Sequence, residues 1–329
     1  MPYGSGLVSG VTIKQIAAHL GVSHMTVSRA LSGSPLVTAE TRALIVKRAE
    51  EMGYVASNAA RIMRGKANRS VGLSLPNFEN AFYARLANRI AERATSLNLQ
   101  MMIGLTHDDP AREEDVLRQF AAQQVGAVAM VPAPDGGDMP TALRNPVLQL
   151  LRQRKGVAAP VLTIEDASAI AAAVEGLKRS GHERIGYIGA DATLSTGSSR
   201  LAAFRQAMGA AFDAELVRTV APSAAAGAAS MAGLLESPRR PTAVVLGGVE
   251  LSSGAIGHVL ESAQDQAPRL VAYGDAYWYG WVMGGLPAIA LPVDELAEAV
   301  IAWLLAILDD HPSDPVQAAP PLAARLVRL

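Results

Sequence analysis

The chain has 329 residues, of which 50% are hydrophobic and 18% are charged. This composition excludes an intrinsically disordered chain, and the length predicts two or three domains rather than one. The sequence contains no cysteine, which excludes disulfides and thiolate chemistry and fits a reducing cytoplasm.

The formal net charge of −1 is unevenly distributed along the chain. Residues 1–70 carry nine Lys or Arg against three Glu, a net charge of +6, whereas the rest holds 20 basic and 27 acidic residues, a net charge of −7. A basic N-terminal part on an acidic body predicts a polyanionic partner for the N-terminal part alone. Charge by itself also allows a solvated basic surface that has no partner.

Neither a targeting segment nor a membrane span is predicted. The first residues, MPYGSGLVSGVTIK, contain no basic stretch followed by an apolar run. The longest apolar stretch, Ala299 to Leu308, is only about half as long as a membrane helix. We therefore expect a soluble, cytoplasmic protein that has no membrane partner.

The first 65 residues predict three short helices. Thr12, Ser23 and Thr38 are each suited to cap the start of a helix, because a hydroxyl can accept the hydrogen bonds of the first backbone amides. Gly21 and Gly53 are placed to end the first and the third helix. Two short helices joined by a tight turn are typical of a helix-turn-helix DNA reader.

The second of these helices predicts two opposite faces. Val27, Ala30 and Leu31 fall on one arc and are expected to pack against the first helix. The other arc carries side chains that suit a major groove, where arginine recognises guanine and apolar groups contact thymine methyls. Its members are His24, Met25, Ser28 and Arg29. Thr26 and Ser28 are also of a type that binds phosphate.

From residue 71 onward, short apolar runs alternate with helical stretches of 12 to 16 residues. The runs are Val71–Leu75, Met101–Leu105, Ala127–Val131, Ile185–Ile188, Ala243–Leu246 and Leu270–Tyr273. Continuous apolar strands that alternate with helices indicate parallel sheets covered on both faces, so we expect two doubly wound α/β lobes. Residues 132–146 are rich in Pro and Gly and predict a surface excursion.

No catalytic motif stands out in the sequence. The six histidines include no pair three or four residues apart, which excludes a metal site of the HExxH kind. There is also no GxSxG elbow, phosphate-binding loop or dinucleotide fingerprint. We expect no catalytic residues, no bound metal and no cofactor.

Residues 11–63 resemble the N-terminal part of the lactose/galactose-repressor (LacI/GalR) family of transcriptional regulators almost position by position. The matching features are Thr12-Ile13-Lys14, Gly21-Val22-Ser23, Thr26-Val27-Ser28-Arg29-Ala30-Leu31, Thr41-Arg42 and Gly53-Tyr54. The resemblance implies a helix-turn-helix domain at 1–56, a hinge helix and linker at 57–69, and a periplasmic-binding-protein-like core at 70–329. Within that core, lobe one would comprise about 70–160 and 288–329, and lobe two about 161–287.

The resemblance also implies which residues contact DNA. In the family, the hinge helix pairs across a dimer and places an apolar side chain in the minor groove. That position is Met63 here, where leucine is usual, and Ala56 stands where proline is usual. Met63 on the surface of a linker is the alternative. The full expected set is Thr12, Ser23, His24, Met25, Thr26, Ser28, Arg29, Asn58, Arg61, Met63 and Lys66.

A ligand site in the core follows from the same resemblance. The family binds its effector between the lobes, and the matching positions are Phe82, Tyr83, Glu165, Arg200, Gly248, Asp275 and Trp278. The two rings could instead begin a core helix, and Arg200 could be a surface charge. His182, which follows a glycine, is expected to be structural. Gly248-Val249 stands where the family usually has Asn-Asp, so we expect Arg200 to lack a counter-charge and to favour a sugar acid.

These observations predict a homodimeric transcription factor, most simply a repressor, that binds palindromic double-stranded operator DNA and responds to a small metabolite such as a sugar or sugar acid. A tetramer is compatible with the sequence. The alternative is a periplasmic-type ligand-binding protein without a DNA function, which shares the core fold. That class would have a signal peptide and would not have the basic helical segment. An enzyme is a third class, for which the sequence offers no motif.

Overall fold

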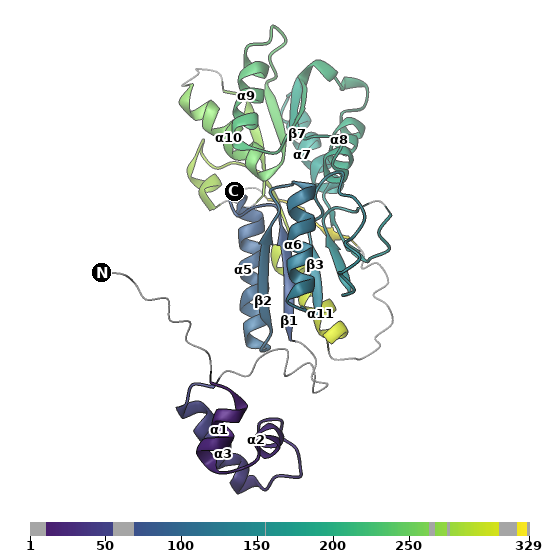
Figure 1. Cartoon of the computed structure of the whole chain (residues 1–329). Helices are drawn as coiled ribbons and strands as arrows, with labels where there is room; N and C mark the ends of the chain where they lie inside the picture. Colours follow the sequence, from purple (N-terminus) through teal and green to yellow (C-terminus); the bar gives the residue numbers. More distant parts are fainter. Residues whose placement is uncertain are drawn as a thin grey trace, which may run out of the picture. The chain divides into compact units, whose positions relative to one another are not determined.

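The computed structural model describes residues 11–54, 69–154, 156–262, 267–274, 277–308 and 321–327. The chain divides into two compact units, Met1–Asn68 and Arg69–Leu329, which we call the head and the core (Figure 1). No helix within the described ranges is long and apolar enough to span a bilayer. Residues 55–68, which include all but the last residue of the expected hinge segment 57–69, lie outside the described residues. Ala56, Asn58, Arg61, Met63 and Lys66 are among them.

The described part of the head contains three helices, α1 (Ile13–Leu20), α2 (His24–Leu31) and α3 (Ala39–Glu51). Each begins at the predicted hydroxyl cap, because the side chain of Thr12, Ser23 or Thr38 accepts a hydrogen bond from the backbone amide three residues later. Gly21 ends α1 with a φ of 65°, a left-handed conformation that glycine adopts without strain. The capping pattern in the sequence therefore correctly predicts where these helices begin.

The head has its own small apolar core. Ile16, Val27 and Ile45 come from the three different helices, and each is at most 1% exposed. Ala17, Ala30, Val37 and Ala49 complete the buried cluster. Burial of Val27 and Ala30 fixes the rotation of α2, which turns the opposite face of this helix toward solvent.

The first lobe of the core is built on a parallel five-stranded sheet with the order β2-β1-β3-β4-β5. Its strands are β1 (Ser70–Leu75), β2 (Gln100–Leu105), β3 (Ala127–Met130), β4 (Val147–Leu150) and β5 (Val161–Leu162). Its helices are α5 (Ala81–Ser96), α6 (Pro110–Ala122) and α11 (Val293–Leu308). Val71 and Leu73 join the apolar cluster of α5 and α11, whereas Gly72 lies against Phe120 of α6. The helices therefore cover both faces of the sheet.

The second lobe is built on a six-stranded sheet with the order β13-β11-β10-β9-β7-β8, in which only β13 is antiparallel to its neighbour. Its strands are β7 (Ile185–Ala190), β8 (Val217–Val220), β9 (Ala243–Gly247), β10 (Arg269–Tyr273), β11 (Ala288–Ala290) and β13 (Arg325–Val327). The helices are α7 (Ala167–Arg179), α8 (Ser195–Met208), α9 (Ala224–Leu235) and α10 (Val249–Glu261), with short 3₁₀ turns at Gly209–Ala211, Ala214–Leu216 and Tyr277–Trp281. A separate pair, β6 (Ile164–Glu165) and β12 (Leu322–Ala323), lies where the chain crosses between the lobes.

One predicted boundary is wrong. We expected residues 288–329 to belong to the first lobe, but only α11 packs there, where Arg89 and Arg93 of α5 pair with Asp294 and Glu298 at 2.8 and 2.7 Å. β11 and β13 pair with each other in the second sheet. The chain therefore returns to the second lobe after α11. Strands of three residues are too short for a recognisable apolar run, which is why the sequence pattern did not reveal this crossing.

Candidate functional site

The outward face of α2 forms one candidate site, for nucleic acid. His24, Met25 and Arg29 are exposed, Met25 by 52% of its surface. Ser28 is half-buried beside them. The side chain of Arg29 has no hydrogen-bond or ion-pair partner among the described residues, so its fork of N–H donors is available to an external acceptor.

Two of the predicted DNA-contacting hydroxyls, those of Thr12 and Ser23, already cap helices, and Thr26 pairs with Ser23. Thr12 donates to Gln15 Oε1 at 2.9 Å, and the backbone amide of Thr12 reaches the same oxygen at 2.8 Å. The Ser23 and Thr26 hydroxyls lie 2.9 Å apart, and Ser23 Oγ also accepts from the Thr26 amide. These residues position the start of α1 and of α2. Whether they also contact phosphate stays a prediction.

A pocket between the two lobes forms the second candidate site. About 660 Å³ there is free of protein atoms, a volume that includes open solvent at the mouth. Most of its polar side chains follow the carboxyl ends of parallel strands, where ligands of open α/β sheets bind. Of the seven predicted effector residues, Phe82, Tyr83, Arg200 and Gly248 line it.

Arg200 of α8 is the centre of a buried polar cluster on the second lobe's side of the pocket. Its Nε donates to Asp166 Oδ2 at 2.5 Å, and Tyr273 Oη donates to the same oxygen at 2.5 Å. Arg200 Nη1 reaches the carbonyl oxygen of Gly247 at 3.2 Å, and the guanidinium stacks 4.4 Å from the centre of the Tyr273 ring. The arginine is therefore held rigidly against the strand ends.

This cluster corrects the expectation that Arg200 lacks a counter-charge. Asp166, which begins α7 and has a side chain only 7% exposed, supplies that charge. The argument that Arg200 favours a sugar acid therefore loses its basis. The predicted acid, Glu165, is adjacent in sequence but does not line the pocket. Its Oε1 instead accepts from the Ser168 amide at 3.0 Å.

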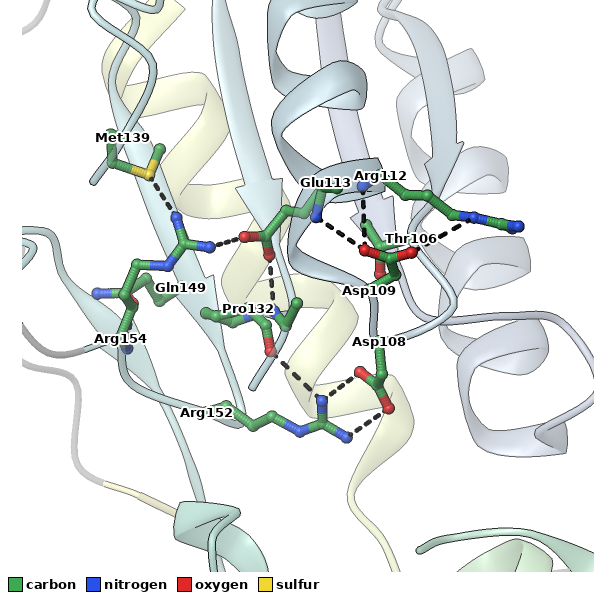
Figure 2. A network of polar contacts seen from close by, with 12 residues as sticks. Thr106, Asp108, Asp109, Arg112, Glu113, Pro132, Met139, Gln149, Arg152 and Arg154 are labelled. Carbon is green, nitrogen blue, oxygen red and sulfur yellow. Dashed lines mark hydrogen bonds and ion pairs between the residues drawn. The ribbon is translucent and has the colours of Figure 1, made fainter. Parts of the chain in front are cut away.

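The first lobe contributes a second arginine–carboxylate pair (Figure 2). Arg152, which follows β4, donates to Asp108 through both terminal nitrogens at 2.5 and 3.3 Å, and to the Pro132 carbonyl at 3.3 Å. Tyr83 lies close enough for the charges of Arg152, Asp108, Arg200 and Glu250 to act on it, although burial is the main reason why its pKa is raised. The charged groups of both lobes thus converge around this ring.

A hydrogen bond between side chains joins the rims of the two lobes. Asn80 caps α5 by accepting from the Phe82 amide at 3.1 Å, and its Nδ2 donates across the pocket to Glu250 Oε2 at 3.2 Å. Burial raises the pKa of Glu250, whereas the hydrogen bond from Asn80 lowers it. The nearby carboxylates of Asp108 and Glu79 raise it further, and the charge of Arg152 lowers it.

Two further predicted residues do not form part of the pocket as described. Trp278 packs on the second lobe's apolar core and lies edge-on to Tyr279, with ring centres 4.5 Å apart. Asp275 lies outside the described residues. His182, expected to be structural, has its Nδ1 3.1 Å from the Thr242 hydroxyl and does not line the pocket.

Sequence reasoning missed Asp108, Arg152, Tyr273 and Glu250 in the lining of the pocket, and Asp166 as the partner of Arg200. All five lie within a few residues of a strand end, and the ends of β2, β9 and β10 were predicted. Position after a strand was therefore an available signal for Asp108, Glu250 and Tyr273. Arg152 follows β4, which was not predicted.

Figure 2 also shows a separate ion pair inside the first lobe. Glu113 of α6 is fully buried, pairs with Arg154, and accepts from the Ala133 amide at 2.7 Å. Neither residue lines the pocket between the lobes. This pair anchors the irregular segment 132–146, which contains no helix or strand, onto α6.

Comparison with known proteins gives consistent results for both parts of the chain. Residues 12–57 match the family model "Bacterial regulatory proteins, lacI family", and residues 174–328 match "Periplasmic binding protein-like domain". The chain is 28% identical to the HTH-type transcriptional regulator DegA of Bacillus subtilis, over 79% of this chain and 77% of that protein. It is 24% identical to the regulator GalR of Escherichia coli, over 92% and 90%.

A solved structure shares the whole fold. The lac repressor dimer bound to operator and an anti-inducer superposes with a TM-score of 0.81 at 19% identity, covering 97% of this chain and 98% of that one. The fold class predicted from the sequence, a helical N-terminal domain followed by two parallel α/β lobes, is therefore confirmed.

Proposed function

Because the chain belongs to the LacI/GalR family of bacterial transcriptional regulators, we propose that it binds palindromic operator DNA as a homodimer and changes its DNA affinity when a small metabolite enters the pocket between the lobes. Repression of transcription in the cytoplasm is the simplest form of this function. The curated relatives it matches are regulators, not enzymes, and we propose no catalytic role.

One observation carries the DNA-binding half of this proposal. α2 buries Val27 and Ala30 in the head and presents His24, Met25 and Arg29 to solvent. An exposed helix with an arginine that has no partner among the described residues suits the major groove. We propose that Asn58, Arg61, Met63 and Lys66 add contacts from the hinge segment, as the resemblance implies.

The pocket supports the sensing half of the proposal. Its walls come from both lobes, so a ligand there contacts the two lobes at once and binds best to one arrangement of them. Phe82, Tyr83 and Arg200 are proposed to contact that ligand, and Asp275 is proposed to join them. A sugar or a sugar-like metabolite fits the combination of aromatic rings and hydrogen-bonding groups in the lining.

Selection of duplexes from a random DNA pool by the full-length protein tests the proposal. We expect enrichment of one inverted repeat, bound by two protein chains, with an affinity that falls steeply as salt is raised. Enriched sites would then be tested for release or tightening by a panel of sugars. Failure to enrich any sequence over bulk DNA would contradict the assignment.

A further inference from the structure

The charges around the pocket do not balance. Asp108 pairs with Arg152, and Asp166 pairs with Arg200, so these four groups cancel. Glu250 is the fifth charged group of this cluster. Its carboxylate has no ion-pair partner among the described Lys, Arg and His side chains, and a neutral amide is its one hydrogen-bond donor. The cluster therefore carries one uncompensated negative charge.

The geometry leaves part of Glu250 open to the pocket. Oε2 accepts from Asn80 Nδ2, whose orientation is fixed because Asn80 Oδ1 caps α5. A carboxylate can accept about four hydrogen bonds, and in the described part of the chain Glu250 accepts this one. The residue lies at the start of α10, two positions after Gly248, and lines the pocket.

The rest of the lining suits a small ring with hydroxyl groups. Phe82 and Tyr83 contribute aromatic rings to the lining, and the two arginine–carboxylate pairs offer both donors and acceptors. An anionic ligand would add a second uncompensated negative charge beside Glu250 in a partly desolvated site. A cationic group would instead compensate the existing one.

We propose that the pocket takes an amino sugar whose ammonium group forms an ion pair with Glu250. This inference rests on the proposed function of the pocket as the effector site and specifies the chemical class of that effector. The aromatic rings pack on the sugar ring, the arginine–carboxylate pairs bind its hydroxyls, and Glu250 selects the amine against a hydroxyl in the same position.

Calorimetry on the full-length protein tests the proposal with matched ligands. The probes are glucosamine, galactosamine and mannosamine, each beside its neutral parent hexose, with gluconate as the anionic comparison. We expect at least one amino sugar to bind about tenfold more tightly than its parent, which is the scale of one charge-assisted hydrogen bond. Gluconate should bind more weakly than either.

Two variants locate the origin of that difference. Glu250→Gln keeps an oxygen for Asn80 and should retain binding of the parent hexose while removing the tenfold preference. Glu79→Gln removes the same charge from an exposed neighbour that does not line the pocket, and it should retain the preference. Thermal unfolding of both variants checks that the fold is unchanged.

Three outcomes would overturn the inference: no amino sugar binds, the parent hexose or gluconate binds more tightly, or the preference persists in Glu250→Gln. Each of these leaves the proposed function intact if the protein still binds its selected operator and responds to another metabolite. Loss of operator recognition would instead reject the proposed function. The calorimetric comparison of the ligands would still test the inference in that case, because it does not depend on DNA binding.

Discussion

Arg200 and Asp166 show how one buried pair combines stability with recognition. Their side chains are 14% and 7% exposed, and Tyr273 donates to the same carboxylate oxygen. Removing one charge from such a pair leaves the other desolvated and uncompensated, whereas removing both avoids that cost.

Arg200→Ala is therefore expected to lower the free energy of unfolding by about 3 kcal/mol. Asp166→Ala should have a similar effect, and the double variant should cost clearly less than the sum of the two. Urea denaturation of the three variants measures this coupling. Simple additivity would mean that the pair contributes no interaction energy.

Arg29 is a residue whose role should depend on DNA sequence. Arg29→Ala is expected to cost about 1–3 kcal/mol at the selected operator and to relax the preference at one guanine. Arg48→Ala is the matched control, because Arg48 pairs with Glu51 at 3.1 Å on another helix. Fluorescence anisotropy with the selected operator and with operators changed at a single base measures the DNA affinity of both variants. Equal losses on every sequence would limit Arg29 to phosphate contact.

At the scale of elements, the close packing of β7 and β9 supports the strand that holds Arg200. Gly189 and Gly247 are register partners in these strands, and a Cβ on either would lie within about 2.4 Å of the Tyr187 side chain. Both glycines therefore leave room for a buried ring. The Gly247 carbonyl also accepts from Arg200, so a shift of this strand would move the arginine.

Gly247→Ala is therefore expected to destabilise the core by about 1–3 kcal/mol through overpacking and to weaken ligand binding. Gly233→Ala is the control. Gly233 lies in α9, and a Cβ there would meet no atom within 4 Å, so this change should stabilise the helix by about 1 kcal/mol. Thermal unfolding of both variants, with calorimetry on Gly247→Ala, tests the contrast. Equal changes in stability for Gly247→Ala and Gly233→Ala would contradict the packing argument.

The sequence predicted elements well where one strong local signal defined them. Hydroxyl caps located α1, α2 and α3, and uninterrupted apolar runs located β1, β7, β9 and β10. β4 escaped because its four residues include Gln149, and β8 because it is only half-buried and contains Arg218. Short or edge strands have no continuous apolar run, so their positions depend on partners far away in the sequence.

The lining of the pocket was also predictable only in part. Phe82, Tyr83 and Arg200 were placed correctly in its lining through the family resemblance. Glu165 was expected in the lining, but it does not line the pocket, and its neighbour Asp166 pairs with Arg200. Two adjacent acids at the start of a helix look equivalent in sequence, and only the fold decides which one faces the arginine. The same holds for the contact between Asn80 and Glu250, which are 170 residues apart.

At the scale of the whole molecule, the charge is divided between the two units. The first 70 residues carry a net charge of +6 and the remainder −7. A protein that begins at Arg69 is expected to keep the folded core and its ligand binding but to lose DNA binding. The full-length protein's affinity should fall with salt, with a log–log slope of about −0.9 per phosphate contacted. Filter binding over a salt series measures this, and tight operator binding by the core alone would contradict it.

The order of the elements along the chain also has a consequence for synthesis on the ribosome. The head is complete once Glu51 has emerged, so it can fold while the core is still being made. Neither lobe has that option. The first sheet waits for α11 to cover one face, and the second waits for β13 at its edge, within the last five residues. A message cut short before α11 would therefore yield a finished DNA-binding head attached to two unfinished lobes, and this would separate DNA occupancy from metabolite control.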